Sequence, residues 1–294
     1  MKRKLMTLLV LVVALVSLSG CTSKSQAFKS SEGKVKVAVT FNAIREFTEA
    51  VGKDKVEILT IIPDGTEPHD FEPKAKDLAS ISQANIFVYN GLGLENWVDN
   101  ALKTVDNNKL IQVDASKNAK GIKEGQEYDP HLWLSISGAV VEIDNIRDAL
   151  IKADAANKAF YTKNAEDYIS KLNSLSDEYK GKFEKVASKK FVTGHAAFAY
   201  LCRDFGLEQN SVEDVFAEGE PSAKQLETLT KYCKDNNIKT VFVESMVSPK
   251  VSNTLANEVG AKAEKIYTEE AKEDGKDYYA AMKYNLEKIY DSLK

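Results

Sequence analysis

The sequence predicts an α/β fold of two lobes, in each of which helices flank a mainly parallel sheet. Two observations support this prediction. β-rich runs alternate with helical segments over 34–116 and again over 190–294, and such alternation implies parallel strands with right-handed crossovers. Between these regions, from about 137 to 187, apolar residues recur at helical spacing and glycine and proline become scarce. We therefore expect two lobes of ordinary domain size, joined by long helices.

In the N-terminal lobe, assigned to 34–154, strands and helices alternate from the first residue. The segment 85–91 carries no charged side chain, which is typical of a parallel strand covered on both faces. The first helix closes on Gly52, a residue suited to a helix C-terminus. The predicted strands are 34–41, 56–63, 85–91 and 109–116, and the predicted helices are 42–52, 75–84 and 94–105.

One long helix is predicted over about 157–187, within the connecting segment 155–187. At 1.5 Å per residue this helix would be about 45 Å long. Its apolar heptads are too irregular and too short for a coiled coil. A rigid backbone between the lobes is therefore the better interpretation.

The strand–helix alternation resumes in the C-terminal lobe, assigned to 188–294. The runs KFVTG and TVFVES are rich in β-branched and aromatic residues, and each is followed by a helical pattern. The predicted strands are 190–194, 210–216, 240–245 and 262–267, and the predicted helices are 195–206, 222–237, 249–260 and 278–294.

The first residues indicate export. Residues 1–20 combine a basic start, an apolar run and small residues before Cys21, which is the layout of a secretory signal peptide. The apolar run is shorter than the roughly 20 residues of a membrane span. LSGC resembles a bacterial lipobox, in which lipid is attached to the cysteine. The sequence thus predicts an extracytoplasmic lipoprotein, anchored to the bacterial membrane through Cys21, with 21–33 as a flexible tether.

The charge of the chain bears on its binding partners, and its cysteines bear on a disulfide. The net charge is −4, and acidic and basic residues are scattered along the chain. Binding to nucleic acid needs a concentrated basic face, so no nucleic acid partner is expected. We expect a monomer. Cys202 and Cys233 are the other two cysteines, and an extracytoplasmic location permits a disulfide between them, a question that the sequence leaves open.

The chain contains only three histidines, each near the junction of a loop with a regular element. His69 lies in GTEPHDFEP, His131 in EYDPHLWLS, and His195 where the strand KFVTG meets its helix. Ligands gather at the carboxyl ends of strands in open α/β sheets, and neutral imidazole is the commonest metal ligand. No HExxH or CxxC motif is present. From the residues alone, a shared metal site and three ordinary hydrogen-bonded histidines therefore remain alternatives.

Seven segments, in order along the chain, resemble the zinc/manganese-binding lipoproteins of bacterial ABC importers. They are GTEPHDFEP, NGLGLENWVDN, DPHLWLS, TGHAAFAYLCRDFGL, EPSAKQL, TVFVES and DYYAAMKYNL, and the resemblance runs from about 34 to 294. It implies two α/β lobes on a rigid helical backbone, with one buried metal site in the cleft. It also implies a membrane permease as partner, and His69, His131 and His195 as metal ligands.

The resemblance further implies a fourth ligand, a carboxylate in the loop before the last helix. Alignment on IYT favours Glu270, with Glu269 as the neighbouring alternative and Asp274 as a weaker one. Three more acids are candidates for supporting roles: Glu67 as a substitute ligand or gate, and Asp129 and Glu244 as acceptors for imidazole N–H groups. The alternative is a solvated loop carboxylate for Glu67, and an ordinary cap or loop residue for Asp129 and Glu244.

Three histidines and one carboxylate suit the tetrahedral coordination of Zn²⁺. In manganese-binding members of the family, a carboxylate typically replaces the third histidine. We therefore expect capture of Zn²⁺ and its delivery to an ABC importer permease, with Mn²⁺ as the alternative. The His-rich loop that many zinc-specific members carry after the first ligand is absent. Because the reference pKa of imidazole is about 6.5, metal binding is expected to weaken below about pH 6.

Two alternative functions are a secreted zinc hydrolase and a cell adhesin. A secreted zinc hydrolase would need an open position for water and a general base, for which Glu67 or Glu244 are candidates. This is the weaker interpretation because Glu270 would close the coordination, so the protein is not expected to be an enzyme. Cell adhesion is a further role suggested for such lipoproteins, and the sequence shows no distinctive patch for it.

Overall fold

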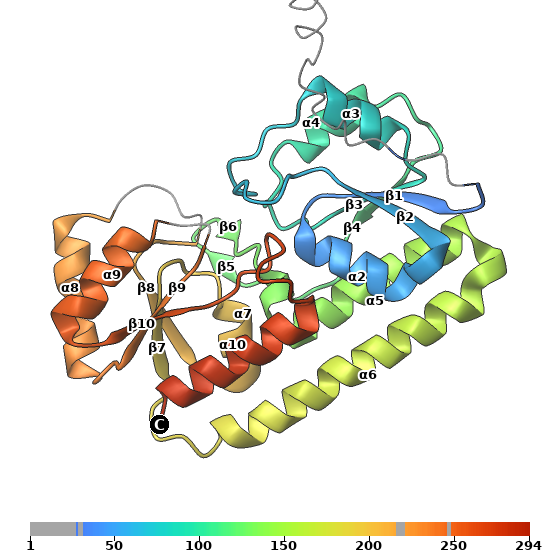
Figure 1. Cartoon of the computed structure of the whole chain (residues 1–294). Helices are drawn as coiled ribbons and strands as arrows, with labels where there is room; N and C mark the ends of the chain where they lie inside the picture. The colour runs from blue at the N-terminus through green and yellow to red at the C-terminus, as the bar shows by residue number, and fades with distance from the viewer. Residues whose placement is uncertain (1–27, 29–31, 216–220, 246–247) are drawn as a thin grey trace, which may run out of the picture.

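The computed structural model describes residues 28, 32–215, 221–245 and 248–294. In this part of the chain two α/β lobes are joined by a long helix, so the predicted fold class is confirmed (Figure 1). No helix among the described residues is both long and apolar enough to cross a membrane. The predicted signal peptide, Cys21 and most of the predicted tether lie outside the described residues.

The N-terminal sheet has four parallel strands in the order β2-β1-β3-β4. The two central strands, β1 and β3, are almost entirely buried, as the lack of charge in 85–91 predicts. All four strands fall inside the predicted segments: β1 Val35–Val39, β2 Val56–Thr60, β3 Ile86–Tyr89 and β4 Ile111–Asp114.

Helices cover both faces of this sheet. α2 (Asn42–Gly52) lies on the face towards the connecting helices, and α3 (Ala75–Ser82) and α4 (Val98–Thr104) lie on the opposite face (Figure 1). A short antiparallel pair, β5 (Lys123–Glu124) and β6 (Glu127–Tyr128), follows β4 and leads to His131.

Two helices form the backbone of the molecule. α5 spans Ile136–Ala153 and α6 spans Lys158–Phe183, with 3₁₀ turns before each at Leu132–Leu134 and Ala155–Asn157. α6 has 26 residues, fewer than predicted, and is therefore roughly 39 Å long. It contacts α2 and α5 of the first lobe and α7 and α10 of the second. Figure 1 shows it running beneath both lobes.

The C-terminal sheet is also parallel, in the order β10-β9-β7-β8. Consecutive strands are placed on opposite sides of β7, so the loops after β7 and β9 diverge, as they do where ligands bind in open sheets. The elements are β7 Lys190–Thr193, α7 Ala199–Phe205, β8 Glu208–Ser211, α8 Ala223–Asp235, β9 Thr240–Val243, α9 Pro249–Val259, β10 Lys262–Lys265 and α10 Tyr278–Ser292.

Several predicted boundaries are wrong. The helix expected over 94–105 is α4, which begins only at Val98. The strand expected at 210–216 is β8 at Glu208–Ser211, an edge strand of polar, largely half-buried residues that an apolar pattern does not mark. The helix expected from residue 195 begins only at Ala199. Side chains satisfy the backbone before it: Gln209 Oε1 accepts from Phe198 N at 2.9 Å, and Glu244 accepts from the N–H of His195. A helical turn is therefore not needed there.

The two lobes share one hydrophobic core. A single cluster of buried residues runs from β1 and α2, through α5 and α6, to α10. At its centre the rings of Phe41 and Trp133 are 4.7 Å apart, and those of Phe47 and Tyr278 are 4.6 Å apart. Tyr278 also donates to the carbonyl of Trp133 at 2.6 Å. Because Tyr278 of the C-terminal lobe contacts Phe47 and Trp133 of the N-terminal lobe, the lobes are packed against each other.

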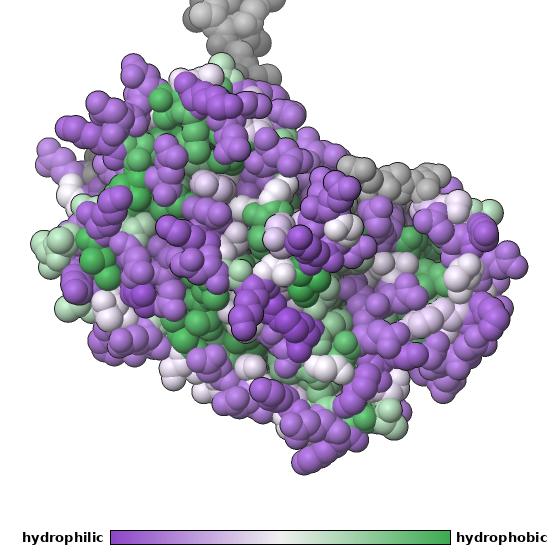
Figure 2. All heavy atoms as spheres, turned by 180° about the vertical axis from the view of Figure 1, so that it is seen from behind, coloured by the Kyte–Doolittle hydropathy of each residue, from purple (hydrophilic) through white to green (hydrophobic). Residues whose placement is uncertain are grey.

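The surface is mainly hydrophilic. On the face seen in Figure 2, polar and charged side chains cover most of the molecule, and apolar atoms show in smaller areas between them. Among the described residues, Tyr128 has an exposed large hydrophobic side chain, with an exposed fraction of 41%.

The two cysteines of the C-terminal lobe are separate. Cys202 in α7 and Cys233 in α8 are both buried free thiols. Burial raises the pKa of the Cys233 thiol to about 11 and shifts that of Cys202 upward as well. The disulfide that the sequence leaves open is therefore not formed in the structure.

Gly138, in the first turn of α5, packs directly on the 3₁₀ turn after His131. A Cβ atom at this position would lie 2.1 Å from the carbonyl oxygen of Leu132. We expect Gly138→Ala to lower the free energy of unfolding by about 1–3 kcal/mol, the usual cost of overpacking. Gly181→Ala in α6, where nothing lies within 4 Å of the added Cβ, should raise it by about 0.5–1 kcal/mol. Urea unfolding followed by circular dichroism measures both. Wild-type stability of G138A would contradict this close packing.

Candidate metal centre

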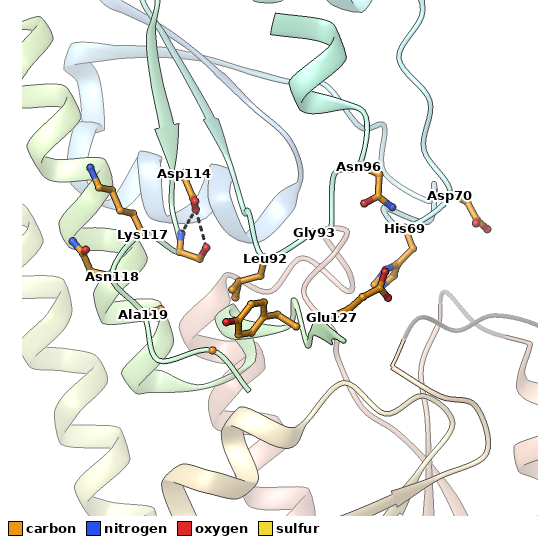
Figure 3. A pocket seen from close by; sticks show the side chains of 13 residues that line it. His69, Asp70, Leu92, Gly93, Asn96, Asp114, Lys117, Asn118, Ala119 and Glu127 are labelled. Atoms are coloured by element: carbon orange, nitrogen blue, oxygen red, sulfur yellow. Dashed lines mark hydrogen bonds between the residues drawn. The ribbon is translucent and has the colours of Figure 1, made fainter. Parts of the chain in front are cut away.

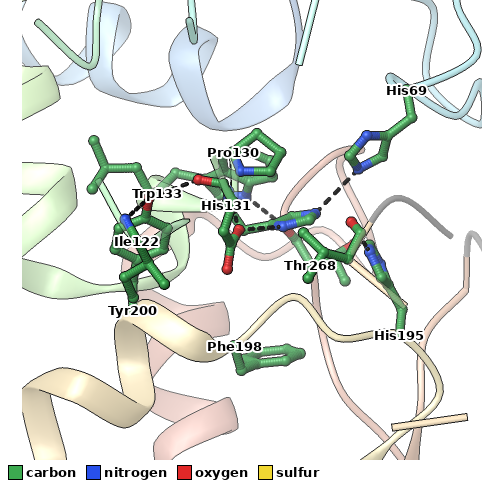
Figure 4. Close-up of polar contacts among 12 residues, drawn as sticks. His69, Ile122, Pro130, His131, Trp133, His195, Phe198, Tyr200 and Thr268 are labelled. Carbon is green, nitrogen blue, oxygen red and sulfur yellow. Dashed lines mark hydrogen bonds and ion pairs between the residues drawn. The ribbon is translucent and has the colours of Figure 1, made fainter. Parts of the chain in front are cut away.

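His69 is carried by the loop between β2 and α3. Its backbone N–H donates to Glu67 Oε1 at 3.3 Å, which holds the two side chains on the same side of the loop. His69 is partly exposed. In Figure 4 its side chain extends from the N-terminal lobe towards His131, and the two imidazole rings are in contact through their Nε2 atoms.

His131 is fully buried between β6 and the 3₁₀ turn that precedes α5. Its Nδ1 lies 2.8 Å from Asp129 Oδ1, and its backbone N–H donates to the same oxygen at 2.9 Å. Tyr200 of the C-terminal lobe in turn donates to the Asp129 carbonyl at 2.6 Å. Because Nδ1–H donates to a carboxylate, Nε2 keeps its lone pair and is free to bind a metal.

His195 follows β7 in the C-terminal lobe and is also buried. Its Nε2 lies 2.9 Å from the carbonyl oxygen of Val215. A carbonyl can only accept, so Nε2 carries the proton and Nδ1 keeps its lone pair. Glu244 accepts from the backbone N–H groups of Gly194 and His195 at 3.1 and 3.2 Å. The prediction that Glu244 accepts from an imidazole N–H is therefore wrong, since its carboxylate holds the main chain instead.

The structure brings the three histidines together from distant points of the chain. One ligating nitrogen of each lies within 4.8 Å of the other two. The Nε2 atoms of His69 and His131 are 3.2 Å apart. Two nitrogens bound at about 2.0–2.1 Å to one tetrahedral ion are separated by roughly 3.3 Å. The spacing is therefore close to that of two ligands of a single zinc ion.

Glu270 is one of two carboxylates, with Glu67, that the structure places near His69. It lies in the loop between β10 and α10 and is only 4% exposed. Its Oε2 accepts from Thr268 Oγ1 at 2.7 Å, while Oε1 is buried with no hydrogen-bond partner in the described part of the chain. Ligand atoms of Glu67, His69 and Glu270 lie within 4.8 Å of one another.

The other two candidate carboxylates of this loop are engaged elsewhere. Glu269 Oε2 accepts from Asn42 Nδ2 at 3.3 Å, at the start of α2. The backbone of Glu269 has a φ of +60°, in the left-handed region. The side chains of Glu269 and Glu270 therefore point in different directions. Asp274 accepts from Lys265 Nζ at 2.9 Å and from Tyr267 O–H at 2.6 Å.

Burial keeps the three imidazoles neutral. Desolvation lowers the pKa of His69 to about 2, and those of His131 and His195 to about 3, and repulsion by neighbouring imidazoles adds to the effect on His69 and His195. Neutral imidazole is the metal-binding form. The expected loss of binding near pH 6 through imidazole protonation is therefore not supported by the structure.

Burial acts in the opposite direction on the carboxyl groups. It raises the pKa of Asp129 to about 7 and that of Glu244 to about 8. The pKa of Glu270 is raised well above its usual value, first by desolvation and then by repulsion from Glu67, whose own pKa is also raised by burial. A bound cation would favour the ionised form of the carboxyl groups it touches.

A cleft of about 870 Å³ leads from solvent to His69. Figure 3 shows His69 and Glu127 close together at one end of the cleft, and Asp114 and Lys117 at the other. Asp70 also lines it. The acidic side chains outnumber the single lysine among the charged lining residues, so the cleft favours approach by a cation.

Some contributors to the centre were missed by sequence reasoning. The Val215 carbonyl orients His195, and the Thr268 hydroxyl donates to Glu270. Trp133 donates to the Thr268 carbonyl at 2.7 Å and so connects the His131 segment to the Glu270 loop. No motif marks a backbone carbonyl as an acceptor. Trp133, within DPHLW, could have been suspected because a buried indole N–H requires a partner.

Two parallel α/β lobes on a shared helical backbone, with buried histidines where the lobes meet, define the class of extracytoplasmic metal-binding proteins that serve importers. Residues 37–292 match the zinc-uptake complex component A, periplasmic (ZnuA) family. The chain belongs to this family. It is a solute-binding protein and not an enzyme, and the hydrolase alternative is not supported.

Individual relatives agree with this assignment. The high-affinity zinc uptake system protein ZnuA of Bacillus subtilis (strain 168) is 38% identical over 299 residues, which cover 95% of this chain and 94% of that protein. The laminin-binding protein Lmb of Streptococcus agalactiae is 36% identical with a TM-score of 0.84, covering 89% of this chain and 100% of that one. The Zn(II)-bound ZnuA-like domain of Streptococcus pneumoniae AdcA is 35% identical with a TM-score of 0.79, covering 89% and 99%.

The lowered imidazole pKa values can be tested directly, because three histidines give only three sets of ring signals. We expect none of them to titrate between pH 5 and 8 in the folded, metal-free protein, as followed by ¹H–¹⁵N NMR of the imidazoles. In urea all three should titrate near pH 6.5. The neutral imidazoles stabilise the fold above the unfolded pKa, and this contribution is lost as the pH falls towards about 3. A ring that titrates near 6.5 in the folded protein would contradict the assignment.

Proposed function

We propose that this protein captures Zn²⁺ outside the cytoplasm and delivers it to the permease of an ABC importer. The bound ion is held by His69, His131, His195 and Glu270. The observation that carries the proposal is the convergence of three neutral imidazoles, each contributing one nitrogen within 4.8 Å of the others. Near one of them, His69, lies the carboxylate of Glu270, of which Oε1 is buried and has no hydrogen-bond partner among the described residues.

The ligand set supports zinc over manganese. Three nitrogens and one carboxylate oxygen suit the tetrahedral preference of Zn²⁺, whereas Mn²⁺ prefers more oxygen ligands. Asp129 and Val215 fix the tautomers of His131 and His195, so that a nitrogen lone pair of each is available. The zinc-related names of the relatives support the same choice.

The lobes, the membrane anchor and the cargo are assigned as follows. We propose that 34–154 and 188–294 act as the two lobes, with the connecting segment 155–187 as a backbone that limits their relative movement. The protein acts as a monomer, anchored to the membrane by lipid on Cys21, with 21–33 as its tether. Zn²⁺ is the cargo, with Mn²⁺ as the metal against which it is to be compared.

Titration calorimetry of the metal-free protein with Zn²⁺ and Mn²⁺ separately tests the ligand set. We expect one tight equivalent of Zn²⁺ and much weaker binding of Mn²⁺. Glu270→Gln should weaken zinc binding by roughly 100-fold or more, since loss of even a supporting residue around a metal costs about 10–100-fold. Glu269→Gln is the matched control and should change the affinity less than about threefold. No stoichiometric zinc binding would overturn the function, and a larger loss in E269Q than in E270Q would overturn the choice of ligand.

Zinc binding should also release protons at neutral pH. Burial raises the pKa of Glu270 well above its usual value, so a cation that binds this carboxylate displaces its proton at a higher pH than it would from an exposed glutamate. Apparent affinity should therefore rise as the pH increases through the neutral range. Calorimetry at pH 7 in phosphate and in Tris, whose ionisation enthalpies differ, measures the released protons. E270Q should release fewer than the wild type, and identical heats in both buffers for the wild type would contradict the expectation.

A further inference from the structure

Two potential metal-binding groups meet at His69. The inner group contains His69, His131 and His195, of which the last two are buried. The outer group contains His69, Glu67 and Glu270, of which Glu67 is partly exposed. In each group the ligand atoms lie within 4.8 Å of one another. His69 is partly exposed and belongs to both groups, so it connects the partly exposed Glu67 to the two buried histidines.

The carboxylates of the outer group are arranged as ligands. Glu270 Oε1 is buried and has no hydrogen-bond partner among the described residues, although an unpaired buried carboxylate oxygen is costly. Glu67 is held next to His69, whose backbone N–H donates to its Oε1 at 3.3 Å. Both carboxylates thus face the imidazole that the two groups share.

The two groups also differ in how they act on a hydrated dication. The inner histidines are neutral ligands and exert no attraction at long range, whereas carboxylates attract a cation before it loses its water. The cleft that reaches His69 is lined by three more acids, Asp70, Asp114 and Glu127. His69 belongs both to the cleft lining and to the outer group, so the acidic cleft and the outer group meet at this residue.

We propose that Glu67, His69 and Glu270 form a capture position, which holds the incoming Zn²⁺ before it moves to the inner histidines. In this transfer Glu67 leaves the ion as His131 and His195 bind, while His69 and Glu270 remain attached. Glu67 is then a ligand on the path of the ion and not in its final coordination. This inference rests on the proposed function, because it concerns how the same ion reaches the same centre.

Rapid mixing of the metal-free protein with Zn²⁺ tests the capture position. Trp133 is a built-in reporter, since its ring lies 5.2 Å from that of His131. A ligand used only in transit lowers the barrier in both directions. We therefore expect Glu67→Gln to slow association and chelator-induced dissociation together, each by roughly tenfold, with the equilibrium affinity within about twofold of the wild type.

Glu72→Gln is the matched control, because Glu72 is an exposed residue of the same loop and its substitution removes the same charge. It should leave both rates nearly unchanged. Faster dissociation of zinc from E67Q would overturn the proposal, since it would make Glu67 a ligand of the final state. Rates of E67Q equal to those of E72Q would overturn it as well. Failure of the wild type to bind Zn²⁺ would instead contradict the proposed function itself.

Discussion

The geometry of the centre depends on the buried indole of Trp133. Its ring packs against Phe41 of the N-terminal lobe at 4.7 Å, and its N–H donates to the carbonyl of Thr268, two residues before Glu270. Tyr278 of the last helix donates to its backbone carbonyl. One side chain, two residues after His131, therefore sets the position of the carboxylate loop relative to the histidine. Displacing the indole would leave buried donors and acceptors unpaired, which is why this arrangement is strongly held.

Burial gives the histidines and the carboxylates opposite responses to protons. Desolvation favours the neutral form of every ionisable group, so it lowers the pKa of the imidazoles and raises that of the Glu270 carboxyl. The nitrogen ligands are thus prepared for metal without any protonation change near neutral pH. The carboxyl becomes ionised when a cation compensates for its charge. Desolvation thus keeps the imidazoles in the form that binds zinc, and it makes Glu270 the ligand whose protonation competes with zinc binding.

The strand that the sequence misplaced is β8, at the edge of the C-terminal sheet. The central strands β1, β3, β7 and β9 lie in the expected segments because strands covered on both faces are continuously apolar. β8 was displaced in the prediction because an edge strand is polar and half-buried. The start of α7 was misplaced because Gln209 and Glu244 satisfy the backbone where a helical turn was expected. Such contacts join distant residues and leave no local pattern.

By itself the sequence determined the fold class, the likeness to metal-binding lipoproteins, and three histidines and a nearby acidic pair as candidate ligands. These features reside in local composition and short motifs. Only the tertiary structure decided which of the adjacent glutamates faces His69, and that Glu67 lies beside Glu270. It also decided which nitrogen of each buried imidazole is free. The reason is physical: these properties follow from burial and from contacts across the chain, such as that of Asn42 with Glu269, 227 residues apart.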